Sequence, residues 1–140
     1  MSYAISPHHP LDSVYCVVYN THMMKHFGEY IRQQREKLRA DNPEFSLRKI
    51  ATKIGVEPSF LSKVERGEQP PPAEAKIALL AEALGEDADI LLALAGKVSS
   101  DLQTVIRQRP KLFAELIREM KDMPDHAVLR LVREVRDGKW

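Results

Sequence analysis

The sequence predicts an all-α protein that has two helical parts. Apolar residues recur at intervals of three and four from Phe27 to Val135, which is the spacing of one face of an α-helix. Glycine and proline interrupt this pattern at distances that suit short helices, as at Gly55, Gly85 and Pro110. With 140 residues, of which 44% are apolar, the chain is long enough for one domain and a small appendage.

The first 23 residues are expected to be a flexible leader or an artefact of the gene start. Pro7–Pro10 favours an extended chain, and Val14–Tyr19 has a strand-like composition without a second strand to pair with. Met23 and Met24 stand directly before the first predicted helix and offer a later start for translation. The alternative is a short arm that pairs between subunits.

Residues 24–96 are expected to form one helical bundle. Helices are predicted over residues 27–40, 47–54, 58–66, 73–84 and 89–95, with glycine closing the last two. The residues predicted to face the core are Phe27, Ile31, Leu38, Leu47, Ile50, Ile54, Leu61, Val64, Ile77, Leu80, Ala81, Leu84, Ile90, Leu91 and Leu94, with Tyr30 near it.

The most informative segment is Leu47–Gly67, which predicts two short helices joined by a tight turn. Ser46 is a suitable N-cap for the first helix, and Gly55 behind it tolerates a left-handed backbone. Ala51 leaves room for a close helix crossing, and Pro58 suits the first turn of the second helix. The pattern indicates a helix-turn-helix, in which the second helix can enter the major groove of DNA. A generic pair of helices in a small bundle is the alternative.

Residues 27–95 resemble the lambda-repressor-like, or XRE-type, helix-turn-helix domain, and Pro58–Gly67 resembles that family's recognition helix and exit turn. The resemblance covers roughly half of the chain. It implies a five-helix DNA-binding bundle without enzymatic activity that binds operators as a dimer. It also implies that Pro58, Ser59, Ser62 and Lys63 read bases. The full set expected to contact DNA is Leu47, Arg48, Glu57, Pro58, Ser59, Phe60, Ser62, Lys63 and Arg66.

The resemblance further implies a structural ion pair between Arg35 and Glu65. The family tends to pair an arginine of its first helix with the glutamate that follows the recognition helix. The alternative is that both side chains are solvated, as most charged residues are.

Two features depart from the family pattern. Glu57 stands where the family usually has a small hydroxyl residue as the helix cap. A carboxylate there suits the helix dipole but is unfavourable beside phosphates; instead, it can accept a hydrogen bond from a cytosine amino group. The loop Arg39–Phe45 is several residues longer than the usual link between the first two helices, which loops tolerate at a small entropic cost.

Residues 97–140 are expected to form a small unit for dimerisation or another protein interaction. Its predicted helices cover residues 100–109, a segment from Pro110 to a break at Pro124, and residues 127–137. Their apolar stripes are too extensive to cover one another in so small a unit, although packing back on the first bundle is an alternative. The expected homodimer interface consists of Leu112, Phe113, Leu116, Ile117, Met120, Val128, Leu131, Val132 and Val135.

The net charge of +1 is unevenly distributed along the chain. Residues 24–72 hold ten Lys and Arg against seven Asp and Glu, a local charge of +3. Residues 1–23 and residues 73–140 each carry a charge of −1. The positive excess on the helix-turn-helix segment predicts a modest non-specific affinity for double-stranded DNA.

Composition argues against several other classes of protein. No apolar run approaches the roughly 20 residues that a membrane span needs. The one cysteine cannot form an intramolecular disulfide, and the five histidines lack the spacing of metal ligands. Neither a glycine-rich phosphate loop nor a serine nucleophile elbow occurs. We therefore expect no enzyme activity, cofactor, metal or membrane association, and a location in the bacterial cytoplasm or nucleoid.

The leading hypothesis is a sequence-specific DNA-binding transcriptional regulator: a dimeric repressor that binds an inverted-repeat operator through helix 58–66. The alternative is an antitoxin-type protein whose C-terminal helices bind a toxin or another protein partner, with DNA binding for autoregulation. Such partner segments are often disordered until bound. Residues 99–137 have apolar stripes at helical spacing, which favours a folded unit.

Overall fold

The computed structural model describes the backbone of residues 10–138, and the side chains of residue 22 and of residues 24–138. Within this range it contains eight α-helices and one 3-10 turn but no strand, so the all-α prediction is confirmed. The chain divides into two compact units after Ser99. None of the described helices is long and apolar enough to cross a membrane.

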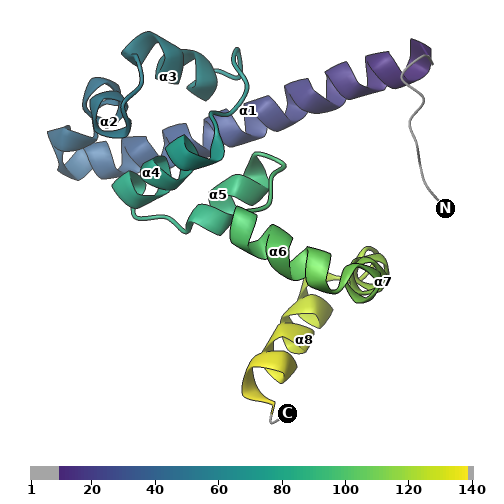
Figure 1. The fold of residues 1–140 in the computed structure, drawn as a ribbon. Helices are drawn as coiled ribbons and strands as arrows, with labels where there is room; N and C mark the ends of the chain where they lie inside the picture. Colours follow the sequence, from purple (N-terminus) through teal and green to yellow (C-terminus); the bar gives the residue numbers. More distant parts are fainter. Residues whose placement is uncertain (1–9, 139–140) are drawn as a thin grey trace. The chain divides into compact units, whose positions relative to one another are not determined.

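The first unit is built around one long helix. It contains α1 (Pro10–Asp41), the 3-10 turn η1 (Pro43–Phe45), α2 (Leu47–Ile54), α3 (Pro58–Glu65), α4 (Glu74–Leu84) and α5 (Ala88–Leu94). The C-terminal part of α1 packs against α3, α4 and α5, whereas its N-terminal part runs beyond them (Figure 1). Helix α2 packs against both α3 and α4.

A single apolar core lies between these helices. The predicted members Leu38, Leu47 and Leu94 are only partly buried, as is Tyr30. The buried apolar residues are Phe27, Ile31, Ile50, Ala51, Ile54, Leu61, Val64, Ile77, Leu80, Ala81, Ala83, Leu84, Leu91, Leu92 and Ala95.

The prediction that Ile90 faces the core is wrong, because its side chain is 51% exposed. Leu92 takes the inward position in α5 and is only 2% exposed. This short helix presents Leu91, Leu92 and Ala95 to the core, and these positions fit one helical face equally well.

The prediction that the first helix begins at Phe27 is also wrong. Helix α1 begins at Pro10 and contains Val14–Tyr19, the segment predicted to be strand-like. Proline suits the first position of a helix, and neither glycine nor proline interrupts residues 11–27. Because residues 10–138 form no strand that could pair with this segment, its β-branched and aromatic residues keep only a weak preference for extended structure. The remaining leader, residues 1–9, lies outside the described range.

The predicted long loop Arg39–Phe45 is mostly helical. Residues 39–41 belong to the last turn of α1, and residues 43–45 form η1. Asn42 joins them, and its side chain accepts a hydrogen bond from the backbone N–H of Glu44 at 3.0 Å. The extra residues therefore lengthen the first helix and add a capped turn.

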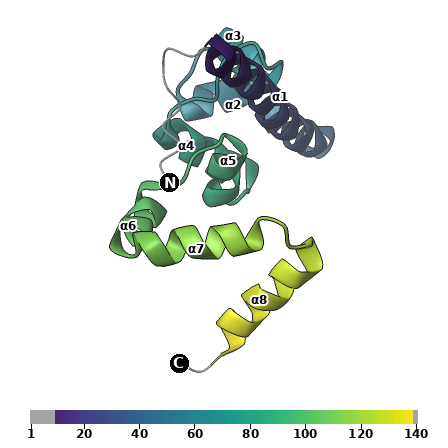
Figure 2. The same ribbon diagram turned by 90° about the vertical axis from the view of Figure 1, so that its right-hand side faces the viewer.

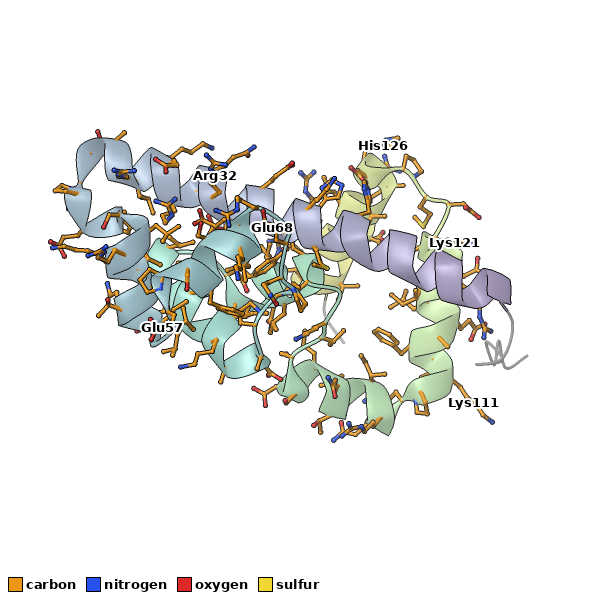
Figure 3. All side chains as sticks on the ribbon, turned by 90° about the horizontal axis from the view of Figure 1, so that it is seen from above. Arg32, Glu57, Glu68, Lys111, Lys121 and His126 are labelled. Atoms are coloured by element: carbon orange, nitrogen blue, oxygen red, sulfur yellow. The ribbon has the colours of Figure 1, made fainter. Side chains whose placement is uncertain are left out.

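The second unit contains α6 (Ser100–Gln108), α7 (Pro110–Met120) and α8 (Asp125–Asp137). Helices α7 and α8 form a V around the turn at residues 121–124 (Figure 2). Lys111 and Lys121 mark the two ends of α7, and His126 marks the start of α8 (Figure 3). None of the described side chains of this unit is buried.

Candidate nucleic-acid interface

Helix α2 and the turn behind it are fixed at both ends. The hydroxyl oxygen of Ser46 accepts a hydrogen bond from the N–H of Lys49 at 3.3 Å, which caps the first turn. Gly55 ends the helix in the left-handed conformation, with a φ of 73°. The Lys76 ammonium of α4 donates to the carbonyl oxygens of Ile54 and Gly55 at 3.0 and 3.3 Å. Sequence reasoning missed Lys76, because nothing local to α4 predicts this contact.

Helix α3 has one apolar edge and one polar face. Leu61 and Val64 are buried in the core, whereas Ser59, Lys63 and Arg66 are exposed at this helix and its C-cap. Glu57 occupies the N-cap position, and its side chain makes no capping hydrogen bond. The next residue, Pro58, has no N–H that would need a partner. Glu57 marks the start of α3 in Figure 3, and Glu68 lies beyond its other end.

Gly28 sets the distance between α1 and α3. A Cβ atom at this position would lie 2.3 Å from the carbonyl oxygen of Val64 and 2.7 Å from that of Glu65. These backbone atoms belong to the last turn of α3, so they cannot move aside as a flexible side chain would. The glycine therefore lets the two helices touch backbone to backbone. The sequence gives one signal for this close helix contact. A glycine stands inside a helical pattern, and glycine destabilises a helix unless another feature requires it.

Arg35 and Glu65, the two residues predicted to pair, form a bidentate buried ion pair. The Arg35 Nε donates to Glu65 Oε1 at 2.6 Å and its Nη2 donates to Oε2 at 3.0 Å, while the side chains are only 4% and 5% exposed. Arg35 also donates to the Phe45 carbonyl oxygen at 3.3 Å and to Glu36 at 3.1 Å. The hydrogen bond with Glu65 raises the pKa of Arg35 against the opposing effect of burial. The pair ties α1 to the end of α3.

A second, exposed ion pair lies at the end of α3. The Arg66 guanidinium donates to both carboxylate oxygens of Glu68, at 3.0 and 3.1 Å, and to the hydroxyl of Ser62 at 2.8 Å. The hydrogen bond from Arg66 lowers the pKa of Glu68, and the same bond raises the pKa of Arg66. Two residues expected to contact DNA, Ser62 and Arg66, are therefore bound to each other in the free protein.

The other residues expected to contact DNA differ in their exposure. Leu47 and Phe60 are partly buried against the core, and Pro58 is half-buried. Arg48 is exposed on α2. It lines a hollow of about 580 Å³ between η1 and α2, together with Glu44, Phe45, Lys49, Thr52 and Lys53. Lys49 and Lys53 add positive charge beside Arg48, although Lys49 is paired with Glu44 at 2.6 Å.

The residues expected to form a dimer interface lie on α7 and α8. Met120, Val128 and Leu131 are half-buried. The hollow between the two helices has a volume of about 350 Å³ and is lined by Leu116, Met120, Leu131, Val132, Val135 and Arg136. The exposed members of the set are Leu112, Phe113, Leu116, Ile117, Val132 and Val135, at 37% to 64%.

Residues 26–94 match the family model of a helix-turn-helix domain. Neither a curated protein nor a solved structure gives a significant match to the chain. The matched residues include α2, α3 and both partners of the Arg35–Glu65 pair, and the match is consistent with the lambda-repressor-like resemblance. A domain of this kind indicates a DNA-binding regulator. Residues 26–94 of the chain are therefore a helix-turn-helix domain.

Proposed function

We propose that this protein is a sequence-specific transcriptional repressor that places α3 in the major groove of DNA. The polar face of α3 carries the proposal. Its buried edge holds the helix on the core, and Gly28 and the Arg35–Glu65 pair hold its C-terminal end. A rigidly held helix presents its polar side chains in one register, which base readout requires.

Each exposed side chain of this face has a proposed role. Lys63 binds a guanine, because its ammonium can donate to O6 and N7 in the major groove. Ser59 and Ser62 assist from bases or phosphates. Arg48 on α2 and Arg66 at the end of α3 bind phosphates, which position the helix without reading sequence. The local charge of +3 on residues 24–72 supports this assignment.

We further propose that the second unit makes the protein a homodimer. None of its described side chains is buried, and α7 and α8 expose an apolar stripe that includes Leu112, Leu116 and Val132. Exposed apolar surfaces of this kind mark interfaces. A two-fold dimer would cover the stripe and place two α3 helices about 34 Å apart, one turn of DNA. Its operator would be an inverted repeat. We infer repression, as opposed to activation, from the lambda-repressor-like family that the chain resembles.

The same apolar stripe supports a second candidate, an antitoxin-type protein that binds a toxin through α7 and α8. The two candidates differ in the state of the purified protein. A repressor of the first kind is a dimer at micromolar concentration, measured by light scattering. An antitoxin-type protein, whose apolar stripe binds a different protein, is a monomer under the same conditions. Either way the protein acts on DNA in the bacterial cytoplasm or nucleoid and needs no cofactor, metal or catalytic step.

Selection from random duplexes tests the proposal. The full chain is mixed with a pool of double-stranded DNA, and the bound fraction is sequenced over several rounds. We expect enrichment of an inverted repeat whose half-sites are about 10 base pairs apart from centre to centre. A bound fraction with no enriched sequence would refute sequence-specific binding. An enriched single half-site without the repeat would refute the dimer.

A further inference from the structure

Glu57 differs from the other acidic residues of the helix-turn-helix segment. Between residues 44 and 68, three of the four glutamates are neutralised within the chain. Glu44 pairs with Lys49, Glu65 with Arg35 and Glu68 with Arg66. Among the described residues, the exposed Glu57 carboxylate has no hydrogen-bond or ion-pair partner.

The first turn of α3 does not bind the Glu57 carboxylate. Glu57 has extended backbone angles, with φ of −68° and ψ of 139°, and its side chain caps none of the first N–H groups of α3. Its backbone carbonyl accepts from the N–H groups of Phe60 and Leu61, at 3.0 and 3.1 Å. Pro58 removes one further donor from the first turn. The carboxylate thus lies at the start of α3, where it suits the helix dipole but makes no capping hydrogen bond.

The start of a recognition helix is the part that reaches the base edges. A carboxylate there is repelled by phosphates, by guanine O6 and N7, and by thymine O4, since all of these are acceptors. The amino group of cytosine is a donor at the edge of the major groove, and a carboxylate accepts from it. Adenine also offers an amino group, but its N7 acceptor lies beside it and repels the second carboxylate oxygen.

We propose that Glu57 is a specificity-determining residue that selects a cytosine at one position of each operator half-site. This inference rests on the proposed function, in which α3 enters the major groove. The negative charge has a second effect, because it weakens binding to every duplex that lacks cytosine at that position. Glu57 therefore gains specificity by disfavouring the wrong sequences as well as by binding the right one.

The test compares the sequences that wild-type protein and Glu57→Gln select from random duplexes. Glutamine binds adenine through N6 and N7, so the selected base at one position per half-site should change from cytosine to adenine. On the wild-type operator, the variant should lose the preference for that cytosine by about fivefold or more. All other positions should keep their preference. Because Glu57 has no hydrogen-bond or ion-pair partner among the described residues and its charge interacts only with the dipole of α3, the variant should melt within a few degrees of wild type.

Glu82→Gln is the matched control, since Glu82 is exposed on α4 and the substitution changes the net charge equally. Its selected sequence should be that of wild type. If Glu57→Gln selects the wild-type sequence unchanged, the inference fails while the proposed function stands. If the wild-type protein itself enriches no sequence, the proposed function fails. A change of preference that Glu82→Gln shares would also refute the inference, because it would follow from charge alone.

Discussion

Arg35 of α1 and Glu65 of α3 form a bidentate ion pair with N···O distances of 2.6 and 3.0 Å, and both side chains are at least 95% buried. The pair connects residues 30 positions apart in the sequence. Because it joins the central helix of the first unit to the end of the proposed recognition helix, it links the stability of the fold to the position of the proposed DNA-binding face.

Glu65→Gln should lower the melting temperature strongly. The substitution removes the buried counter-charge of the Arg35 guanidinium and leaves only the exposed Glu36 carboxylate beside it, and the loss of a buried partner costs on the order of 3–5 kcal/mol. For a domain of this size the loss corresponds to a fall of more than about 10 °C, measured by circular dichroism. Glu68→Gln breaks an exposed ion pair and is the control; its melting temperature should stay close to that of wild type. Equal and small shifts of the melting temperature in both variants would show that the buried Arg35–Glu65 pair stabilises the protein no more than the exposed Arg66–Glu68 pair does.

Gly28→Ala should destabilise the protein although alanine is the better helix former. In an open helix the change would stabilise by about 1 kcal/mol. Here the new methyl group would stand 2.3 Å from the Val64 carbonyl oxygen, so α1 and α3 must separate. We expect a lower melting temperature and weaker DNA binding. A rise in melting temperature would contradict the close backbone contact between α1 and α3.

Glu68→Gln should increase affinity for DNA of any sequence. In the free protein the Arg66 guanidinium is bound by the Glu68 carboxylate, and the variant releases it for a phosphate. One additional phosphate contact steepens the dependence of log K on log salt by about 0.9. Fluorescence anisotropy with a duplex of unrelated sequence measures both quantities. In the double variant Arg66→Gln/Glu68→Gln the steeper salt dependence should vanish. If it persists, the additional phosphate contact is not made by Arg66.

The pKa of the Tyr30 phenol should lie above its ordinary value of 10.0. Burial raises the pKa of its phenol, and so does the hydrogen bond that it donates to Glu86 at 3.1 Å. A raised pKa in the folded state means that stability is complete below the ordinary value of 10.0 and is lost as the pH rises through the folded pKa. Tyr30→Phe should therefore flatten the alkaline fall in stability, measured by urea unfolding. The same fall in both proteins would exclude Tyr30 as its source.

The sequence predicts well those features that local chemistry determines. Ser46 and Gly55 bound α2 as expected, because caps and left-handed turns depend on a few neighbouring residues. Tertiary features are harder to predict. The backbone contact at Gly28, the Lys76 hydrogen bonds to the end of α2 and the exposure of Ile90 all depend on how distant helices meet.

The extent of α1 was mispredicted for another reason. Val14–Tyr19 has a composition typical of strands, but a strand needs a partner and the described part of the chain contains none. The predicted contact residues of α3 followed from position in the motif. That Ser62 and Arg66 bind each other could not be foreseen, because side-chain rotamers at a helix end leave no pattern in the sequence.

The second unit should control how the protein binds its operator. A chain shortened to residues 1–99 keeps every residue of the apolar core. We expect it to be a folded monomer that binds the full operator more weakly than the whole chain, because the second half-site contact is no longer intramolecular. Light scattering and anisotropy measure the two properties. Equal affinity of the two chains for the full operator would contradict a dimer formed through α7 and α8.

If α3 reads bases, the Lys63→Ala variant should lose a base preference, and its binding to DNA tests this role of α3 most directly. Binding of wild type and variant is measured on the selected operator and on every single-base substitution of it. We expect the variant to lose about 1–3 kcal/mol of discrimination at one guanine per half-site and to keep the wild-type discrimination at all other positions. Lys53→Ala on α2, the control, should keep the wild-type preference at every position. If Lys63→Ala also retains the full preference at every position, α3 is not the recognition helix.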